Sequence, residues 1–150
     1  QAKALNFGLI YGMGVLGFAQ SAKVDRATAK TFIDAYFKEF VIELKRYLKT
    51  NSVVVEIGSN DGTMLSHFKG YKILGVDPST NVVIRALSKG VPTLSSGFNE
   101  QNARNIKQEF GSADLIGGAN CIAHINDIHS LMRGVKELLS DEGVFWVECN

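Results

Sequence analysis

The chain has 150 residues, of which 45% are apolar and 21% charged, so we expect a globular domain with its own hydrophobic core rather than a disordered segment. The formal net charge of +1 gives no bulk electrostatic argument for a nucleic-acid partner. No unbroken apolar run reaches the roughly 20 residues of a membrane span, and no secretory signal is recognisable. Two cysteines, Cys121 and Cys149, are too few for a disulfide framework or a CxxC metal site, which favours the reducing cytoplasm and predicts no metal.

Neither end of the chain has the sequence features expected where a helix or strand begins or ends. Gln1 to Phe7 resemble the interior of an element, because no N-cap signal precedes them. Asn150 follows directly on an apolar, strand-like run. We therefore expect a fragment that has been cut at both ends.

The amino-terminal part of the chain predicts helices. Residues 1–20 are rich in glycine and apolar side chains, and after Asp25 the apolar residues recur with the spacing of an amphipathic helix. The pattern predicts a helix over about residues 26–48. We expect residues 1–40 to form a helical segment that precedes a separate core, residues 41–150.

From Ser52 onward, short β-branched runs alternate with longer mixed segments. The predicted strands are residues 53–58, 72–77, 91–95, 113–120 and 143–149. The predicted helices between them are residues 64–69, 80–89, 100–110 and 126–139. Nearly continuous apolar strands that alternate with helices predict an α/β fold, in which a Rossmann-like, doubly wound parallel sheet is covered on both faces.

The first predicted strand ends in a glycine-bearing turn, Glu56-Ile57-Gly58-Ser59-Asn60-Asp61-Gly62. Gly58 and Gly62 allow a tight turn and a close approach to a ligand at the carboxyl end of the strand. Asp77 ends the next strand about 20 residues further on, where a carboxylate can accept both hydroxyls of a ribose. These features alone fit a dinucleotide, S-adenosylmethionine, or a plain α/β domain with a glycine-rich turn.

The spacing within the turn favours S-adenosylmethionine over a dinucleotide. A dinucleotide site usually carries GxGxxG, so that a pyrophosphate can rest on the helix N-terminus. Here two glycines are separated by three residues that include Asn60 and Asp61, and Glu56 ends the strand. Acidic side chains in this turn suit a cationic methionyl group and repel a pyrophosphate.

Residues from about 41 to 150 resemble the class I S-adenosylmethionine-dependent methyltransferases, and among them the C-methyltransferases of nucleotide-linked deoxysugars. The resembling stretches are VVEIGSNDGTML, ILGVDPSTNV, KGVPTL, ADLIGGANCIAHI and LLSDEGVFWVEC. The resemblance implies a sheet of order 3-2-1-4-5, truncated at its end, and a small-molecule acceptor such as a nucleotide sugar. It implies these cofactor-binding residues: Glu56, Gly58, Ser59, Asn60, Gly62, Asp77, Pro78, Phe98 beside the adenine, and Asn120.

The resemblance also places His124 near the floor of the active site, after the fourth strand. A neutral imidazole can accept a proton at physiological pH, so His124 is the candidate catalytic residue; the alternative is a packed histidine at a strand end. Two parts of the family pattern have no counterpart in this sequence: the cysteine-rich zinc module and the Tyr/His/Glu-rich motif that supplies the base. We therefore expect cofactor binding, with transfer dependent on residues outside this chain.

Residues 1–40 show a second, unrelated resemblance. Lys3, Phe7 and Tyr11 recur at four-residue intervals, which puts them on one helix face. These side chains could bind a triphosphate and stack on a base. The alternative is an ordinary apolar helix face with one surface lysine. The pattern K-x-x-x-N-F-G-x-x-Y-G resembles the fingers helix of family A DNA polymerases. The resemblance implies a nucleotide-binding helix, and a DNA partner only if this segment functions.

Three hypotheses follow from the two resemblances. The first is the cofactor-binding half of a methyltransferase, the second a DNA polymerase fragment fused to it, and the third an inactive chimera. The chimeric hypothesis predicts that residues 1–36 dock poorly and expose Phe7, Tyr11 and Phe18.

Overall fold

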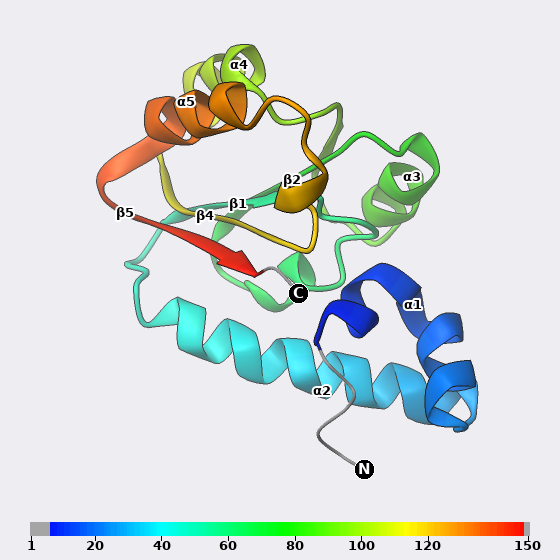
Figure 1. Cartoon of the computed structure of the whole chain (residues 1–150). Helices are drawn as coiled ribbons and strands as arrows, with labels where there is room; N and C mark the ends of the chain where they lie inside the picture. Colours follow the sequence, from blue (N-terminus) through cyan, green and yellow to red (C-terminus); the bar gives the residue numbers. More distant parts are fainter. Residues whose placement is uncertain (1–6, 149–150) are drawn as a thin grey trace.

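The computed structural model describes the backbone of residues 7–148 and the side chains of residues 15–148. Twelve elements follow one another in the described part of the chain (Figure 1). They are α1 (Phe7–Ala22), α2 (Arg26–Lys45), β1 (Val53–Ile57), η1 (Leu65–His67), β2 (Lys72–Asp77), α3 (Thr80–Ser88), β3 (Thr93–Ser95), α4 (Glu100–Phe110), β4 (Ala113–Ala119), η2 (Ile122–His124), α5 (Ile128–Leu138) and β5 (Leu139–Glu148).

The five strands form one parallel sheet of order β3-β2-β1-β4-β5, which confirms the predicted fold class and strand order. In the centre, Val55 pairs with Leu74 of β2 on one side and with Ile116 of β4 on the other. The strand order reverses between β1 and β4. A ligand crevice is therefore expected at the carboxyl ends of these strands.

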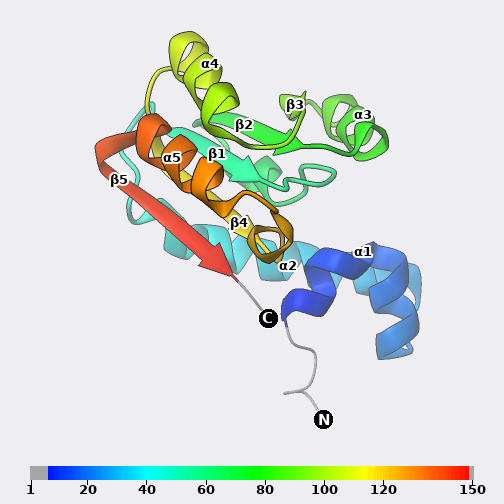
Figure 2. The same ribbon diagram turned by 45° about the horizontal axis from the view of Figure 1, so that its top comes forward.

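Helices cover both faces of the sheet, as Figures 1 and 2 show. α4 and α5 lie on one face, and α2, η1 and α3 lie on the other. Alternate residues of β1 enter the two cores: Val54 joins the core under α2, and Val55 joins the core under α4 and α5. Because both faces of β1 are buried, all of its residues except Glu56 are apolar.

The predicted helix near residues 26–48 is confirmed as α2, and a capping side chain fixes its start. Asp25 accepts hydrogen bonds from the Thr28 backbone N–H at 2.9 Å and from the Thr28 hydroxyl at 2.7 Å. The first of these bonds satisfies one of the backbone donors that the first helical turn leaves open. None of the helices in the described part of the chain is both long and apolar enough to cross a membrane.

The expected exposure of Phe18 is wrong. Phe18 is only 2% exposed, and its ring stacks on that of Phe32 at a centroid distance of 5.2 Å. The reason is that α1 folds back along α2, so Phe18 joins the same core as Ile33 of α2 and Val54 of the sheet. The side chains of Phe7 and Tyr11 lie outside the described residues.

Two predicted elements differ in extent from the structure. The helix predicted at residues 64–69 is reduced to η1, because Gly62 (φ +73°) and Gly70 (φ +86°) leave the helical region on both sides and allow only a short turn. β5 begins at Leu139 rather than near residue 143. Its register against β4 shifts between Ala113 and Leu115, which accommodates the additional residues.

Candidate functional site

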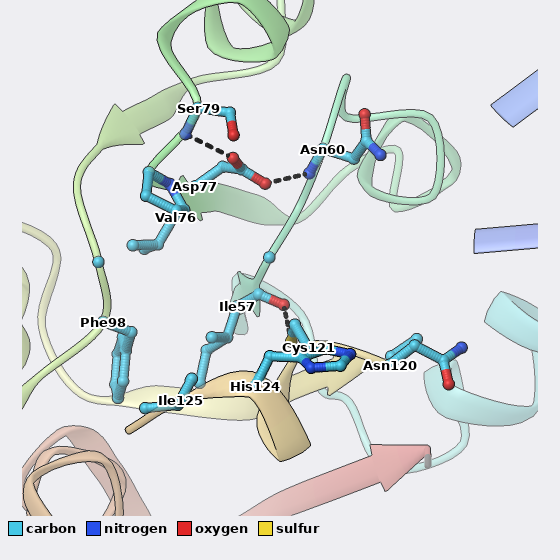
Figure 3. A pocket seen from close by; sticks show the side chains of 14 residues that line it. Ile57, Asn60, Val76, Asp77, Ser79, Phe98, Asn120, Cys121, His124 and Ile125 are labelled. Atoms are coloured by element: carbon cyan, nitrogen blue, oxygen red, sulfur yellow. Dashed lines mark hydrogen bonds between the residues drawn. The ribbon is translucent and has the colours of Figure 1, made fainter. Parts of the chain in front are cut away.

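A cavity of about 390 Å³ opens at the carboxyl ends of β1, β2 and β4 (Figure 3). It lies where the strand order reverses, as expected for a ligand site of a doubly wound sheet. The turn after β1, the exits of β2 and β4, and the segment before α4 all contribute to its walls. Most of the predicted site residues meet there: Gly58, Asn60, Asp77, Pro78, Phe98, Asn120 and His124.

Close contact between two loops shapes the floor of the cavity. Gly58 has φ +67°, and a Cβ atom there would lie 2.7 Å from the Cβ atom of Cys121. The Cys121 thiol donates a hydrogen bond to the Ile57 carbonyl oxygen at 3.1 Å. The turn after β1 can approach the loop after β4 this closely only because residue 58 lacks a side chain.

Asp77 is the acidic side chain in the cavity wall, and two backbone N–H groups orient it. Its Oδ2 atom accepts from the Asn60 N–H at 3.0 Å, and its Oδ1 atom accepts from the Ser79 N–H at 2.8 Å. The residue is 8% exposed. Each carboxylate oxygen keeps a further lone pair, so Asp77 can accept hydrogen bonds from two neighbouring hydroxyls of a ligand.

Asn60 owes its place in this arrangement to its backbone conformation. Its φ of +52° lies in the left-handed region, which asparagine tolerates better than most residues. The backbone N–H faces Asp77, and Figure 3 shows the side chain extending away from that carboxylate. Asn120 at the end of β4 has a similar φ of +53°, so both turns that border the cavity carry a left-handed asparagine.

An apolar wall faces the carboxylate. Phe98 is 5% exposed, and Val76 and Ile125 line the cavity with it (Figure 3). A flat aromatic face beside aliphatic side chains suits the ring of a nucleobase. The cavity thus combines a carboxylate for hydroxyl groups with an apolar slot for a planar ring.

Three predicted residues support the turn without lining this cavity: Glu56, Ser59 and Gly62. Glu56 is 1% exposed within β1, as its place at the end of a buried strand predicted. The Ser59 hydroxyl packs over Gly75 of β2 and has no hydrogen-bond partner among the described residues. Gly62 faces Val91, and a Cβ atom there would lie 2.8 Å from Val91 Cγ1.

Asp61, the acidic residue within the turn, does not line this cavity. Its Oδ2 atom accepts from Lys89 Nζ at 2.6 Å, and its Oδ1 atom accepts from the Thr63 hydroxyl at 2.6 Å. Burial raises the pKa of Asp61, but hydrogen bonds from Lys89 and Thr63 outweigh this effect and hold the pKa below its usual value. Asp77 is therefore the residue that supplies a negative charge to the wall of this cavity.

Sequence reasoning missed several residues of the wall, including Val76, Cys121 and Ile125. Val76 immediately precedes Asp77, and the position of Asp77 at a strand end could have indicated it. Ile125 follows η2, a short turn with no recognisable sequence signal. Ser79 acts on Asp77 through its backbone N–H, and any residue other than proline could supply that group.

His124 lies at the cavity wall, and its residue is exposed. Lys3 lies outside the described residues, as do the side chains of Phe7 and Tyr11, so the nucleotide-binding face predicted for the amino-terminal helix stays a prediction. No group of three or more histidine, cysteine, aspartate or glutamate side chains is placed to hold a metal ion within residues 15–148.

Two kinds of relatives match the sequence. C-methyltransferase NovU of Streptomyces niveus is 41% identical over 103 residues, which is 67% of this chain and 24% of NovU. DNA polymerase I of Caldicellulosiruptor bescii is 30% identical over 116 residues, which is 77% of this chain and 12% of the polymerase. The chain thus spans about a quarter of NovU and about an eighth of the polymerase.

Solved structures of methyltransferases share the fold. The plantazolicin methyltransferase BamL, solved with a triazolic desmethylPZN analog and SAH, has a TM-score of 0.58 at 19% identity and covers 76% of this chain and 44% of its own. An S-adenosylmethionine-dependent methyltransferase from Clostridium acetobutylicum has a TM-score of 0.57 at 18% identity and covers 76% of this chain and 49% of its own. These similarities establish the architecture.

The family model for the methyltransferase domain matches residues 29–149. This range contains the whole sheet and every residue of the cavity wall. It also overlaps the stretch that is similar to DNA polymerase I of C. bescii, because that similarity extends over most of the chain. The chain belongs to the methyltransferase domain family.

Proposed function

We propose that this chain is the S-adenosylmethionine-binding core of a methyltransferase that methylates a carbon atom of a nucleotide-linked sugar. The observation that carries the proposal is the Asp77 carboxylate, which two backbone N–H groups orient at the wall of the cavity. An adenosine fits these features, because its ribose offers two neighbouring hydroxyls and its base a planar ring. The low cysteine content agrees with a reducing compartment, and we place the protein in the cytoplasm.

Each part of the cavity has a role in holding the cofactor. Asp77 accepts the ribose hydroxyls, Phe98 borders the adenine, and Gly58 lets the backbone approach the methionyl part closely. Asn120 and His124 lie after β4 and face the reacting end. When bound, S-adenosylmethionine supplies a methyl group that its sulfonium has already activated.

Transfer to carbon requires a proton to leave the acceptor. A base takes the proton next to a carbonyl, the electron pair attacks the methyl carbon, and the pair of the broken carbon–sulfur bond stays on sulfur. The protein therefore has to align the two reactants and place a base. His124 brings an imidazole to the cavity wall, and an imidazole nitrogen can serve as a general base.

Similarity to NovU supports carbon as the methylated atom. The stretches that resemble sugar C-methyltransferases support a nucleotide-linked sugar as acceptor, because they coincide with β1, β2, β4 and the turns that build the cavity wall.

Calorimetric titration of S-adenosylhomocysteine into the purified chain tests the proposal. We expect binding that Asp77→Ala removes and that Asp141→Ala, which changes an exposed acid of β5, leaves unchanged. Absence of binding by the folded wild-type chain would contradict the proposed function. If cofactor binds, titration of a thymidine diphosphate keto sugar into the cofactor-loaded chain then tests the acceptor, and weaker sugar binding by His124→Gln with unchanged cofactor affinity supports the proposed place of His124 beside the acceptor.

A second candidate function is nucleotide binding by the amino-terminal segment in a chimeric chain. Similarity to DNA polymerase I supports it, and the Lys3, Phe7 and Tyr11 pattern would supply the contacts. Titration with a deoxynucleoside triphosphate and with duplex DNA tests this candidate. Binding that Lys3→Ala weakens would support it, and no binding would leave these residues with a structural role only.

A further inference from the structure

A second cavity, of about 360 Å³, lies behind the turn that follows β1. It is bounded by α1 through Val15, by the amino-terminal half of α2, by the turn itself and by α3. Asn60 lines both cavities. Figure 3 shows the Asn60 side chain extending away from Asp77, so the turn separates the two spaces.

Four basic side chains lie in the wall of this second cavity, together with two acidic and four apolar ones. Arg26 and Lys30 come from α2, and Arg85 and Lys89 come from α3 and its C-cap. Two helices that are far apart in the sequence thus present four cations to one space. Such a convergence attracts anions, and the positive potential is strongest where low-dielectric walls surround it.

The two acidic side chains of this wall do not neutralise the four basic ones. Asp61 is paired with Lys89 at 2.6 Å, which leaves Asp34 as the acidic side chain of this wall beside Arg26, Lys30 and Arg85. Arg26, Lys30 and Arg85 have no ion-pair partner among the described residues. On the opposite face of the sheet, arginines are paired: Arg104 and Arg133 both bind Glu100.

We propose that this second cavity binds the phosphate groups of a small phosphorylated ligand. Guanidinium groups suit phosphate because their planar donors match its oxygens, and lysine adds a point charge. The volume lies within the range of small-molecule sites and admits a diphosphate. The ligand is either a free phosphorylated molecule or the diphosphate of the nucleotide-linked acceptor, and only this second source rests on the proposed function.

Titration of the full chain with inorganic pyrophosphate tests the proposal. We expect binding whose dissociation constant rises at least about tenfold in Arg85→Gln and in Lys30→Gln, since each variant removes one charge-assisted contact. Arg104→Gln is the matched control, because Arg104 is exposed and lies outside the cavity. S-adenosylhomocysteine affinity is measured on the same variants and should stay unchanged, which separates this proposal from the proposed function.

Two further ligands identify the source of the phosphate. A thymidine diphosphate hexose that binds more tightly than pyrophosphate, with the same loss in Arg85→Gln, supports the acceptor as ligand. Equal affinities support a free phosphorylated molecule. The proposal is overturned if pyrophosphate does not bind, if Arg104→Gln weakens binding as much as Arg85→Gln does, or if only duplex DNA binds.

Discussion

The two cavities on either side of the turn after β1 are similar in volume and opposite in chemistry. The cavity at the strand ends carries one carboxylate, Asp77, opposite an apolar wall with Phe98. The cavity behind the turn carries four basic side chains. One short segment, which contains Asn60, therefore separates a space suited to an adenosine from a space suited to phosphate.

The two cavities also differ in how their polar groups are held. Backbone N–H groups fix both oxygens of Asp77, so its lone pairs have a defined direction before a ligand arrives. Arg26, Lys30 and Arg85 are exposed and end long side chains that must be ordered on binding. We therefore expect geometric selectivity in the first cavity and a more general attraction for anions in the second.

The largest effect is expected from Gly58→Val. A side chain at this position meets Cys121 and must adopt a positive φ, so S-adenosylhomocysteine binding should be lost and the free energy of unfolding should fall by about 1–3 kcal/mol. Pyrophosphate binding should persist, because residue 58 does not line the second cavity. Calorimetry and urea unfolding measure the three quantities.

Gly90 provides the control for Gly58. It has φ +77°, close to the φ of +67° at Gly58, but a Cβ atom there would meet nothing within 4 Å. Gly58→Ala and Gly90→Ala thus both place an alanine at a positive φ, and only the first adds a contact with Cys121. We expect Gly58→Ala to lower the free energy of unfolding more than Gly90→Ala does, and equal losses in the two variants would contradict the close approach of the two loops.

Asp77→Asn should weaken S-adenosylhomocysteine about 10- to 100-fold. An asparagine removes the charge and turns an NH₂ group toward one of the two backbone N–H donors. The contact with the ligand is therefore weaker, and the side chain at position 77 is no longer held in the same orientation. Calorimetry measures the loss, with Asp141→Asn as the exposed control. Unchanged affinity would mean that the ligand hydroxyls bind elsewhere.

Phe98→Leu should weaken S-adenosylhomocysteine by a smaller amount, about 5- to 10-fold. Leucine keeps an apolar side chain in the wall but loses the flat face for the base, and stacking of this kind contributes about 1–3 kcal/mol in related settings. Thermal unfolding serves as the control for packing. If affinity and stability fall in proportion across several Phe98 variants, the result would argue against stacking.

The smallest effect is expected from Lys89→Met. The pKa of Asp61 is lowered in the folded chain, so its ion pair stabilises the fold above the unfolded pKa and the contribution is lost as the pH falls through the folded value. At pH 7 the variant should lose less than about 1 kcal/mol, because both side chains are partly exposed. Urea unfolding should show this difference shrinking between about pH 5 and pH 3; a constant difference would contradict the role of Asp61.

The sheet was predictable because its inner strands, β1, β2 and β4, are largely buried on both faces and because the strands alternate with amphipathic helices. Gly58 and Asp77 could be placed in the site for a similar reason, since both terminate such strands. The burial of Phe18 was not predictable, because it depends on α1 folding back onto α2 and on no local pattern. The cavity behind the turn was missed because Arg26 and Arg85 belong to helices that only the tertiary fold brings together.

The most direct test of this division of roles is a nuclear magnetic resonance titration of the ¹⁵N-labelled chain with S-adenosylhomocysteine. We predict large shifts for the amides of Ser79 and Cys121, which border the cavity at the strand ends, and little change for Lys30 and Arg85 behind the turn. Shifts at Lys30 and Arg85 without shifts at Ser79 and Cys121 would contradict the account.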